Sequence, residues 1–172
     1  MPLSVISFEG PVGVGKTTLG RAVSSHLGFG FVDGDDHSLP GPWLRSILQT
    51  SRRIARACEE QLETRPVVIM AYPLRCTNWL FFRETFRRRG IAYYCISLAA
   101  DAAHIAARER LLTPDEMARS SQMTAQGYGQ RPFSDLVIRT DKGGFAFTRD
   151  HLADKVRGLV SGPSQKQRSR ST

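Results

Sequence analysis

The sequence has few cysteines and no long hydrophobic run. Its three cysteines, Cys58, Cys76 and Cys95, lie far apart and form no C-x-x-C pair, so we expect neither a disulfide framework nor a zinc site. No apolar stretch approaches the roughly 20 residues that span a bilayer. No basic region leading into an apolar core marks the N-terminus as a secretory signal. We therefore expect a soluble cytoplasmic protein with free thiols and no membrane partner.

Acidic residues are also scarce, 16 against 24 basic ones, which gives a formal net charge of +8. Part of this excess lies in residues 161–172, a Ser/Gln/Arg-rich segment in which Lys166, Arg168 and Arg170 are accompanied by no acid. Such a segment is typical of a disordered basic tail. The remaining residues, 1–160, are of the right length for one globular domain.

Short apolar runs alternate with amphipathic segments along this domain. The apolar runs predict strands at residues 3–8, 29–32, 67–71, 91–98 and 135–139. Helical spacing of apolar residues predicts helices at residues 16–27, 44–62, 80–89, 99–112 and 151–160. This alternation is typical of α/β proteins, and it predicts a five-stranded parallel sheet with helices on both faces.

A glycine-rich motif follows the first predicted strand. Residues 10–17 read GPVGVGKT and match the phosphate-loop pattern G-x-x-x-x-G-K-[ST] in full. Between a strand and a helix, such a loop turns its backbone N–H groups toward a phosphate, the lysine reaches the β- and γ-phosphates, and the following threonine binds Mg²⁺. The residues expected to hold ATP and Mg²⁺ here are Gly10, Gly13, Val14, Gly15, Lys16, Thr17 and Thr18.

The second predicted strand ends in an acidic cluster, "VDGDDH", at residues 32–37. Because Gly34 lets the chain turn, Asp33 and Asp35 can both face the phosphate loop. This cluster resembles the D-G-D signature of gluconate kinases and the D-x-D of shikimate kinases, and Pro42-Trp43-Leu44 and Leu74-Arg75 follow the gluconate kinase order. The resemblance covers nearly all of the domain and implies a three-layer P-loop kinase fold.

The same resemblance implies an activity, the transfer of the γ-phosphoryl group of ATP to a hydroxyl of a small polar metabolite. It implies that Asp33 supports Mg²⁺ through water, and that Asp35 binds the acceptor hydroxyl and takes its proton. Arg75, after the third predicted strand, is expected to receive an acceptor carboxylate or phosphate. Arg52 is a further candidate for binding the acceptor, because its helix would wall the acceptor pocket.

Related kinases carry a mobile lid after the fourth strand, with an arginine that clamps the transferring phosphate. Arg108 and Arg110 are the two candidates for this role. The chain also departs from both families. Only residues 36–41 separate Asp33-Gly34-Asp35 from Pro42-Trp43-Leu44, a shorter segment than in gluconate kinases, and residues 71–74 replace the glycine-rich stretch of shikimate kinases. We therefore expect the acceptor to be neither gluconate nor shikimate.

Two other functions remain open on the sequence. The opening "EGPVGVGKTTL" is also similar to that of deoxynucleoside and thymidylate kinases, which makes a nucleoside or nucleotide kinase the second hypothesis. The basic tail and Arg87–Arg89 motivate a third, a nucleotide-binding regulatory or RNA-binding protein. The acidic cluster beside the phosphate loop would repel a nucleic-acid backbone, so we do not expect a nucleic-acid partner. The oligomeric state is left open.

Overall fold

A parallel sheet lies at the centre of the molecule. The computed structural model describes residues 1–108 and 111–162. Its strands are β1 (Ser4–Glu9), β2 (Gly30–Asp33), β3 (Val67–Ala71), β4 (Ala92–Ala99) and β5 (Leu136–Arg139). Within the described residues, they pair in the order β2-β3-β1-β4-β5, and every pairing is parallel. The predicted five-stranded parallel sheet is therefore confirmed.

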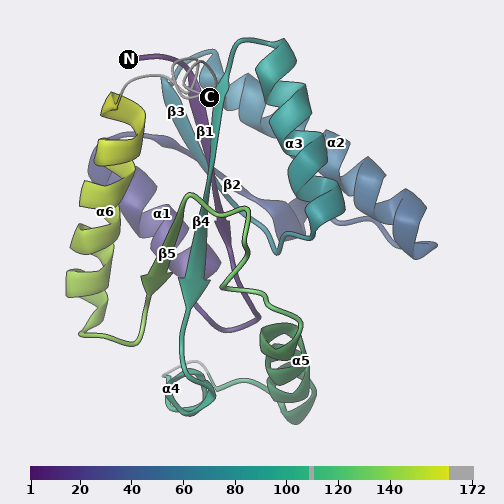
Figure 1. Cartoon of the computed structure of the whole chain (residues 1–172), viewed down its shortest axis with the longest axis vertical. Coiled ribbons are helices and arrows are strands. Elements are labelled where there is room, and N and C mark those ends of the chain that lie inside the picture. Colours follow the sequence, from purple (N-terminus) through teal and green to yellow (C-terminus); the bar gives the residue numbers. More distant parts are fainter. Residues whose placement is uncertain (109–110, 163–172) are drawn as a thin grey trace, which may run out of the picture.

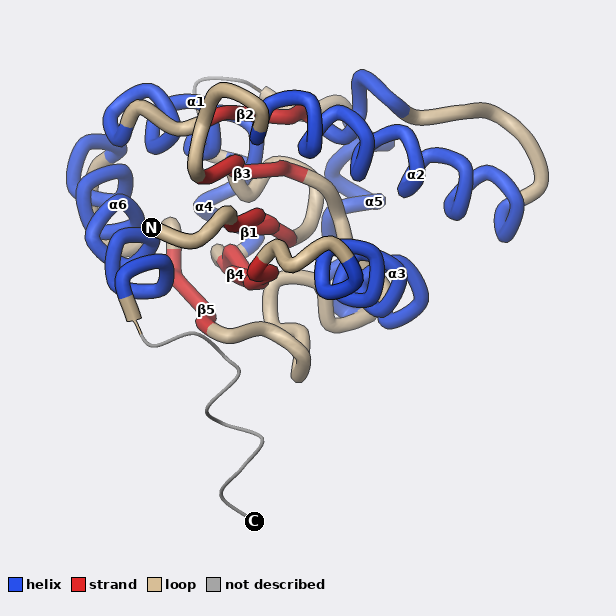
Figure 2. The backbone as a smooth tube through the Cα atoms, turned by 90° about the horizontal axis from the view of Figure 1, so that it is seen from above, coloured by secondary structure: helices blue, strands red, loops and turns tan. Residues whose placement is uncertain are grey.

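Helices cover both faces of this sheet. They are α1 (Lys16–Leu27), α2 (Trp43–Leu62), α3 (Cys76–Arg88), α4 (Ala102–Ala106), α5 (Pro114–Ala125) and α6 (Phe145–Ser161), with a 3-10 helix, η1 (Gly34–His37), directly after β2. Helices α1 and α6 pack on one face, and α2 and α3 on the other (Figure 2). Helices α4 and α5 lie beyond the C-terminal ends of the strands (Figure 1). The C-terminal ends of the strands therefore point toward α4 and α5 (Figure 1).

The two cores follow from the alternation of side chains along the strands. Ile6 and Phe8 of β1 face α1 and α6, whereas Val5 faces α2 and α3, where it joins Phe82 and Phe86. All five of these side chains are fully buried. A central parallel strand is buried on both faces, which explains why β3 and most of β4 are apolar and why the polar residues of β1 are buried as well.

The predicted helix at residues 99–112 is wrong in its bounds. Strand β4 continues through Ala99, and the helix that follows, α4, spans only five residues. The sequence analysis missed α5 altogether, although its start carries a recognisable signal. Thr113 caps the helix, Pro114 occupies its first turn, and the Glu116 side chain accepts a hydrogen bond from the Thr113 N–H at 2.9 Å. This capping box fixes the start of α5.

Other helix ends agree more closely with the sequence. Gly28 ends α1 in the left-handed conformation, with φ of 70°, as its position after an amphipathic segment predicts. Helices α3 and α6 begin earlier than expected, at Cys76 and Phe145. Helix α6 also includes Ser161, the first residue of the predicted tail, and residues 163–172 lie outside the described part of the chain. The disordered tail therefore stays a prediction.

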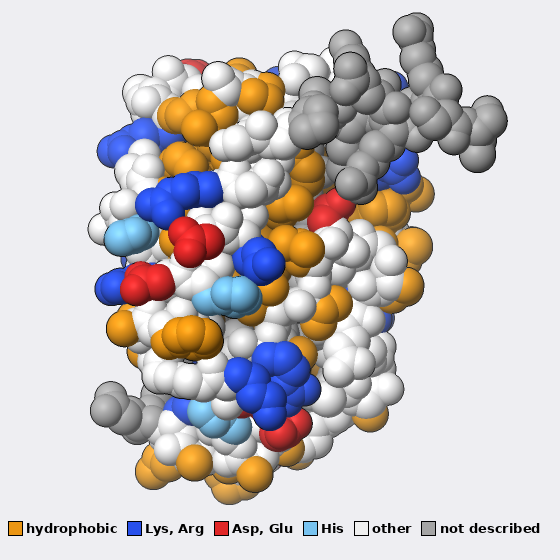
Figure 3. Space-filling view, turned by 60° about the vertical axis from the view of Figure 1, so that its left-hand side comes forward, with side chains coloured by type: hydrophobic (Ala, Val, Ile, Leu, Met, Phe, Trp, Pro, Cys, Tyr) orange, Lys and Arg blue, Asp and Glu red, His pale blue; other side chains and the backbone are white. Residues whose placement is uncertain are grey.

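The surface around α6 carries charges of both signs (Figure 3). Two ion pairs lie on this helix, Arg149–Asp150 at 2.8 Å and Arg157–Asp154 at 2.9 Å. Such mixed pairs are typical of a solvated helix face and contribute little to stability. Among residues 1–108 and 111–162, no helix is both long and apolar enough to cross a membrane.

Candidate functional site

The loop between β1 and α1 has the backbone that an anion cradle requires. Gly10, Gly13 and Gly15 have φ values of 155°, 82° and 105°, which residues with side chains rarely adopt. Helix α1 starts after Gly15 with no side-chain cap and no acidic residue in its first turn. The first N–H groups of α1, together with the partial positive charge of its N-terminus, are therefore available to an anion.

Lys16 is folded over this loop. Its Nζ donates hydrogen bonds to the carbonyl oxygens of Gly10 at 2.8 Å and Pro11 at 2.9 Å. Burial lowers the pKa of Lys16 to about 8, and the nearby carboxylate of Asp35 opposes this shift more than any other charge does. An ammonium group with so depressed a pKa gains from a second negative charge, and a bound polyphosphate supplies one.

A cavity of about 300 Å³ opens above the loop. The residues of its wall that matter here are Gly13, Gly15, Lys16, Thr17, Thr18, Asp35, Arg108 and Arg119. We call this space the phosphate-loop cavity. Two of the expected loop residues lie outside its wall. Gly10 opens the loop, and Val14 is fully buried, where its carbonyl oxygen accepts a hydrogen bond from Thr140 Oγ1 at 3.0 Å.

Arg108, two residues after the end of α4, reaches the phosphate loop. Its guanidinium donates to the Gly13 carbonyl oxygen at 2.9 Å and to Thr140 Oγ1 at 3.0 Å. Partial burial lowers the pKa of Arg108, but an arginine stays charged at physiological pH. The structure thus brings Arg108 to the phosphate-loop cavity. Arg110, the other candidate, lies outside the described residues.

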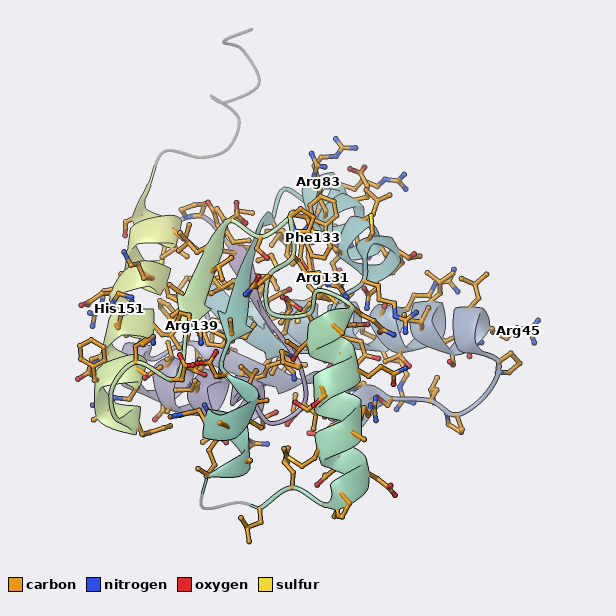
Figure 4. All side chains as sticks on the ribbon, turned by 60° about the horizontal axis from the view of Figure 1, so that its bottom comes forward. Arg45, Arg83, Arg131, Phe133, Arg139 and His151 are labelled. Carbon is orange, nitrogen blue, oxygen red and sulfur yellow. The ribbon has the colours of Figure 1, made fainter. Side chains whose placement is uncertain are left out.

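An ion-pair cluster holds the start of α4 against the end of β5. Arg139, which ends β5, bonds to Asp101 at 2.7 Å and to Asp141 through Nε at 2.9 Å (Figure 4). Asp141 Oδ2 accepts a second bond from the same guanidinium and one from the Asp101 N–H at 2.8 Å. The guanidinium of Arg139 holds the pKa of Asp141 well below its usual range. This cluster joins the end of β4 to the end of β5.

The two aspartates of the acidic cluster separate in the structure. Asp35 lines the phosphate-loop cavity, whereas Asp33 lines a different hollow together with Asp36 and His37. Asp33 caps η1, where one carboxylate oxygen accepts a hydrogen bond from the Asp35 N–H at 3.2 Å. Its other oxygen lies 3.9 Å from the guanidinium of Arg21. The turn expected at Gly34 is the 3-10 helix η1, and it directs Asp35 toward Lys16.

A second cavity of about 330 Å³ adjoins the first. It is enclosed by three parts of the chain, and its polar wall comprises Ser38, Ser46, Thr50, Tyr72, Arg75, Arg119, Gln122, Gln126 and Tyr128. We call it the polar cavity. Arg75 enters it from the start of α3 and donates to the Tyr128 hydroxyl at 2.9 Å. Arg52 is exposed on α2 and lines neither cavity.

Arg119 lines both cavities, and the sequence analysis did not identify it. It lies on the exposed side of α5, close enough to Lys16 to oppose protonation of that residue. The signal that leads to Arg119 is the capping box at Thr113, because that box predicts α5 and places Arg119 two turns into a helix. Sequence alone gives no indication that α5 faces the phosphate loop.

The residues present fit a nucleotide with a bound Mg²⁺. The open N-terminus of α1 and the charge of Lys16 suit a polyphosphate. No group of three or more His, Cys, Asp or Glu side chains able to hold a metal occurs in the described part of the chain. Mg²⁺ in nucleotide sites takes one or two protein oxygens and completes its shell with phosphates and water. The Thr17 hydroxyl at the cavity wall fits that pattern.

No protein-family model and no curated protein matches this sequence. Solved structures do match it. A gluconokinase from Sinorhizobium meliloti 1021 is 18% identical with a TM-score of 0.57, and the match covers 91% of this chain and 97% of that one. A shikimate kinase from Acinetobacter baumannii, in complex with shikimate, is 22% identical with a TM-score of 0.55, covering 92% and 93%.

An APS kinase from Mycobacterium tuberculosis, in complex with AMPPNP and APS, is 16% identical with a TM-score of 0.65, and the match covers 94% of this chain and all of that one, 100%. These proteins match nearly end to end, so the similarity includes the whole described domain and not the phosphate loop alone. At such low identity the match establishes the fold. The chain has the P-loop small-molecule kinase fold that the resemblance implied.

Proposed function

We propose that the protein is an ATP- and Mg²⁺-dependent kinase that phosphorylates a hydroxyl of a small, polar, negatively charged metabolite. The observation that carries this proposal is the contact between the two cavities. Arg119 belongs to the wall of each, and Asp35 lies on the phosphate-loop side. A donor and an acceptor held in adjoining cavities meet the main requirement of phosphoryl transfer, which is positioning. The gluconokinase, shikimate kinase and APS kinase structures support the assignment.

On the donor side, this chain supplies charge and backbone donors. Lys16 leaves the carbonyl oxygens of Gly10 and Pro11 and binds the β- and γ-phosphates, while the first N–H groups of α1 hold the α- and β-phosphates. Mg²⁺ would be held by the Thr17 hydroxyl and would neutralise charge on the β- and γ-phosphates. Asp33 lines the neighbouring hollow, so it would act on the metal only from outside the cavity wall, through water and through its charge near Lys16. Arg108, held near the loop by Gly13, adds a further positive charge.

On the acceptor side, Asp35 accepts the proton of the reacting hydroxyl. The acceptor oxygen forms a bond to the γ-phosphorus, the bond between that phosphorus and the β–γ bridging oxygen breaks, and ADP leaves with the electron pair. Arg119 stabilises the charge on the transferring group because it reaches the boundary between the cavities. Lys16, Arg108, Arg119 and the N-terminus of α1 thus place positive charge around the group in transit.

The polar cavity supports an acceptor that carries a negative charge. Among the residues that the structure describes, Arg75 and Arg119 are the charged members of its wall, and no aspartate or glutamate contributes to it. Arginine binds carboxylate and phosphate with paired hydrogen bonds. The polar cavity has a volume of about 330 Å³, which suits a compact metabolite. Hydroxyl and amide side chains such as Thr50 and Gln122 suit the remaining hydroxyl groups of such a molecule.

A screen of ATP consumption tests this function. The wild-type protein with ATP and Mg²⁺ is offered sugar acids, cyclic hydroxy acids, neutral polyols of the same size, nucleosides and aminoglycosides, and ADP release is measured. We expect turnover with a hydroxy acid or a phosphorylated polyol and little with its uncharged analogue. Turnover confined to nucleosides would instead support a nucleoside kinase. Silence across the panel would favour the regulatory hypothesis.

Arg119→Met is expected to lower kcat about 100-fold, the usual effect of removing one preorganised donor from a developing negative charge. Methionine keeps the helix and most of the side-chain volume. ATP binding should change little, because Lys16 and the helix N-terminus remain. The measurement is steady-state kinetics on the acceptor found in the screen.

The control for this variant is Arg88→Gln. Arg88 is exposed near the end of α3 and lines neither cavity. Its replacement should leave kcat unchanged. Equal losses in the two variants would mean that the effect reflects overall positive charge, and Arg119 would then have no special place in the reaction.

A further inference from the structure

A buried carboxylate lies beneath the phosphate loop and takes no part in the chemistry proposed above. Glu9, the last residue of β1, is fully buried. Its Oε1 accepts hydrogen bonds from the Gly129 N–H at 2.9 Å and from Ser97 Oγ. Its Oε2 is buried with no hydrogen-bond partner among the described residues. A carboxylate buried with one oxygen unpaired is costly, so its presence calls for a physical reason.

Glu9 joins two distant parts of the chain. The next residue, Gly10, opens the phosphate loop, whereas Gly129 follows α5. Gly129 has φ of 85°, and a Cβ at this position would lie 2.6 Å from the carbonyl oxygen of Leu98 and 3.2 Å from Pro11. The chain after α5 therefore lies directly against the end of β4 and the start of the phosphate loop, and the Glu9 carboxylate bonds to it there.

From Gly129 the contacts continue to the polar cavity. The neighbouring residue, Tyr128, lines that cavity, and its hydroxyl accepts the hydrogen bond from Arg75. The guanidinium of Arg131 lies 3.9 Å from the centre of the Tyr128 ring and donates through Nε to the carbonyl oxygen of Leu74 at 2.9 Å (Figure 4). The Tyr128–Arg75 pair is thus positioned by the short segment at residues 128–131, which Glu9 links to β1 through its bond with Gly129.

We propose that Glu9 is a positioning residue that fixes the Tyr128–Arg75 pair of the polar cavity relative to the phosphate loop. This inference rests on the proposed function, because it assumes that the polar cavity holds the acceptor. Glu9 lines neither cavity, so it acts through Gly129 and not by touching a substrate. The positive charges of Lys16 and Arg131 stabilise its ionised form against the burial that raises its pKa. Acceptor binding therefore depends on a residue of β1, the strand that leads into the ATP-binding loop.

Kinetics of two Glu9 variants test the inference. Glu9→Ala removes Oε1 and is expected to raise the acceptor KM about tenfold, as when one well-placed hydrogen bond is misaligned. The ATP Kd, measured by calorimetry, should stay within about threefold of wild type, since the glycines, Lys16 and the N-terminus of α1 are unchanged. Glu9→Gln keeps an oxygen able to accept from Gly129, so it should restore most of the acceptor KM. If Glu9 had only a structural role, Glu9→Ala would weaken the binding of ATP and of the acceptor to the same extent. That result would overturn the inference.

A double variant tests the route. If Glu9 acts through Tyr128, then Tyr128→Phe raises the acceptor KM in the wild type but adds little in the Glu9→Ala background. Fully additive effects would mean that Glu9 and Tyr128 act separately, and the proposed route would be wrong. Should Glu9→Ala fail to fold, Gly129→Ala tests the same contact from the other side, because its Cβ displaces the segment from Leu98. It too should raise the acceptor KM and spare ATP binding.

Hydrogen exchange of the unliganded protein separates this inference from the proposed function. In Glu9→Ala, amides of residues 127–131 should exchange faster than in wild type, whereas amides of α6 should be unaffected. Faster exchange in a protein that phosphorylates nothing would keep the anchoring role and reject the kinase. Unchanged exchange at residues 127–131 would overturn the anchoring role, whatever the enzyme phosphorylates.

Discussion

Replacing Lys16 with alanine is expected to lower kcat/KM at least about 1,000-fold, because the variant loses the positive charge that binds the transferring phosphoryl group. Lys16 lies in the wall of the phosphate-loop cavity, next to the open N-terminus of α1. No other lysine or arginine in that wall belongs to the phosphate loop, so Arg108, which follows α4, and Arg119 of α5 cannot take its place. The loss should appear in ATP affinity and in turnover together.

The fold should survive this change. The carbonyl oxygens of Gly10 and Pro11 lose a donor, which costs about 1–3 kcal/mol if water does not replace it. Removal of a buried ammonium group, whose pKa is lowered to about 8, offsets part of that cost. Thermal unfolding and ADP formation are the two measurements. Lys155→Ala, on the exposed side of α6, is the control and should behave as wild type. Full activity in Lys16→Ala would reject the proposed mechanism.

The lowered pKa of Lys16 gives a second measure of its role. In the free protein the ammonium group loses its proton as the pH rises through about 8. Only the charged form binds phosphate strongly, so ATP affinity should weaken above that pH, by about tenfold for each pH unit at the limit. Below about pH 8 Lys16 stays protonated, so its titration should leave ATP affinity unchanged. This pH dependence of ATP affinity should disappear in Lys16→Ala. If it persisted in that variant, a residue other than Lys16 would be its cause.

Asp35→Asn is expected to lower kcat by about 10²- to 10⁴-fold, the contribution of a general base. Asparagine keeps the shape of Asp35 and its place on η1 but cannot accept the proton of the acceptor hydroxyl. ATP affinity should remain within about threefold of wild type, because the phosphate loop is intact. A collapse of ATP affinity would place Asp35 in the nucleotide site and reject its assignment as the base.

Asp36 provides a matched control one residue away. It lies on the same 3-10 helix and carries the same charge, but it lines the hollow on the Asp33 side and not the phosphate-loop cavity. Asp36→Asn should therefore leave turnover unchanged. If both variants lost activity alike, the cause would be the net charge of η1, and the direction of the Asp35 side chain would carry no meaning.

The sequence predicts the fold and the phosphate loop because both depend on local patterns. Strands buried on two faces are rich in apolar residues, and their alternation with helices favours a parallel sheet. The loop is contiguous, so residues 10–17 specify a strand end, a turn and a helix start together. The glycine conformations and the uncapped start of α1 agree with that interpretation.

The polar cavity could not be predicted in the same way. Its wall combines residues from α2 and the segment before it, from the loop between β3 and α3, and from α5 and the turn after it, and only the folded chain brings them together. Arg119 was missed because residues 99–112 were interpreted as one helix, which left Thr113 without its role as a cap. Whether Arg52 reaches the cavity depends on how α2 is rotated about its axis. The spacing of apolar residues shows which face of a helix is buried, but it does not show what each exposed residue lies next to.

The separation of the two cavities along the chain has a consequence for protein engineering. Every residue that lines the polar cavity lies outside the β1–loop–α1 segment, Ser4–Leu27. Positions that line the polar cavity alone, such as Gln122 and Gln126, can therefore be randomised to select for a new acceptor while the ATP-binding segment is left intact. Libraries should keep Arg119, which lines both cavities, and Gly129, whose bond to Glu9 holds the chain after α5 against the sheet. The acceptor can then be changed without altering the residues that handle ATP.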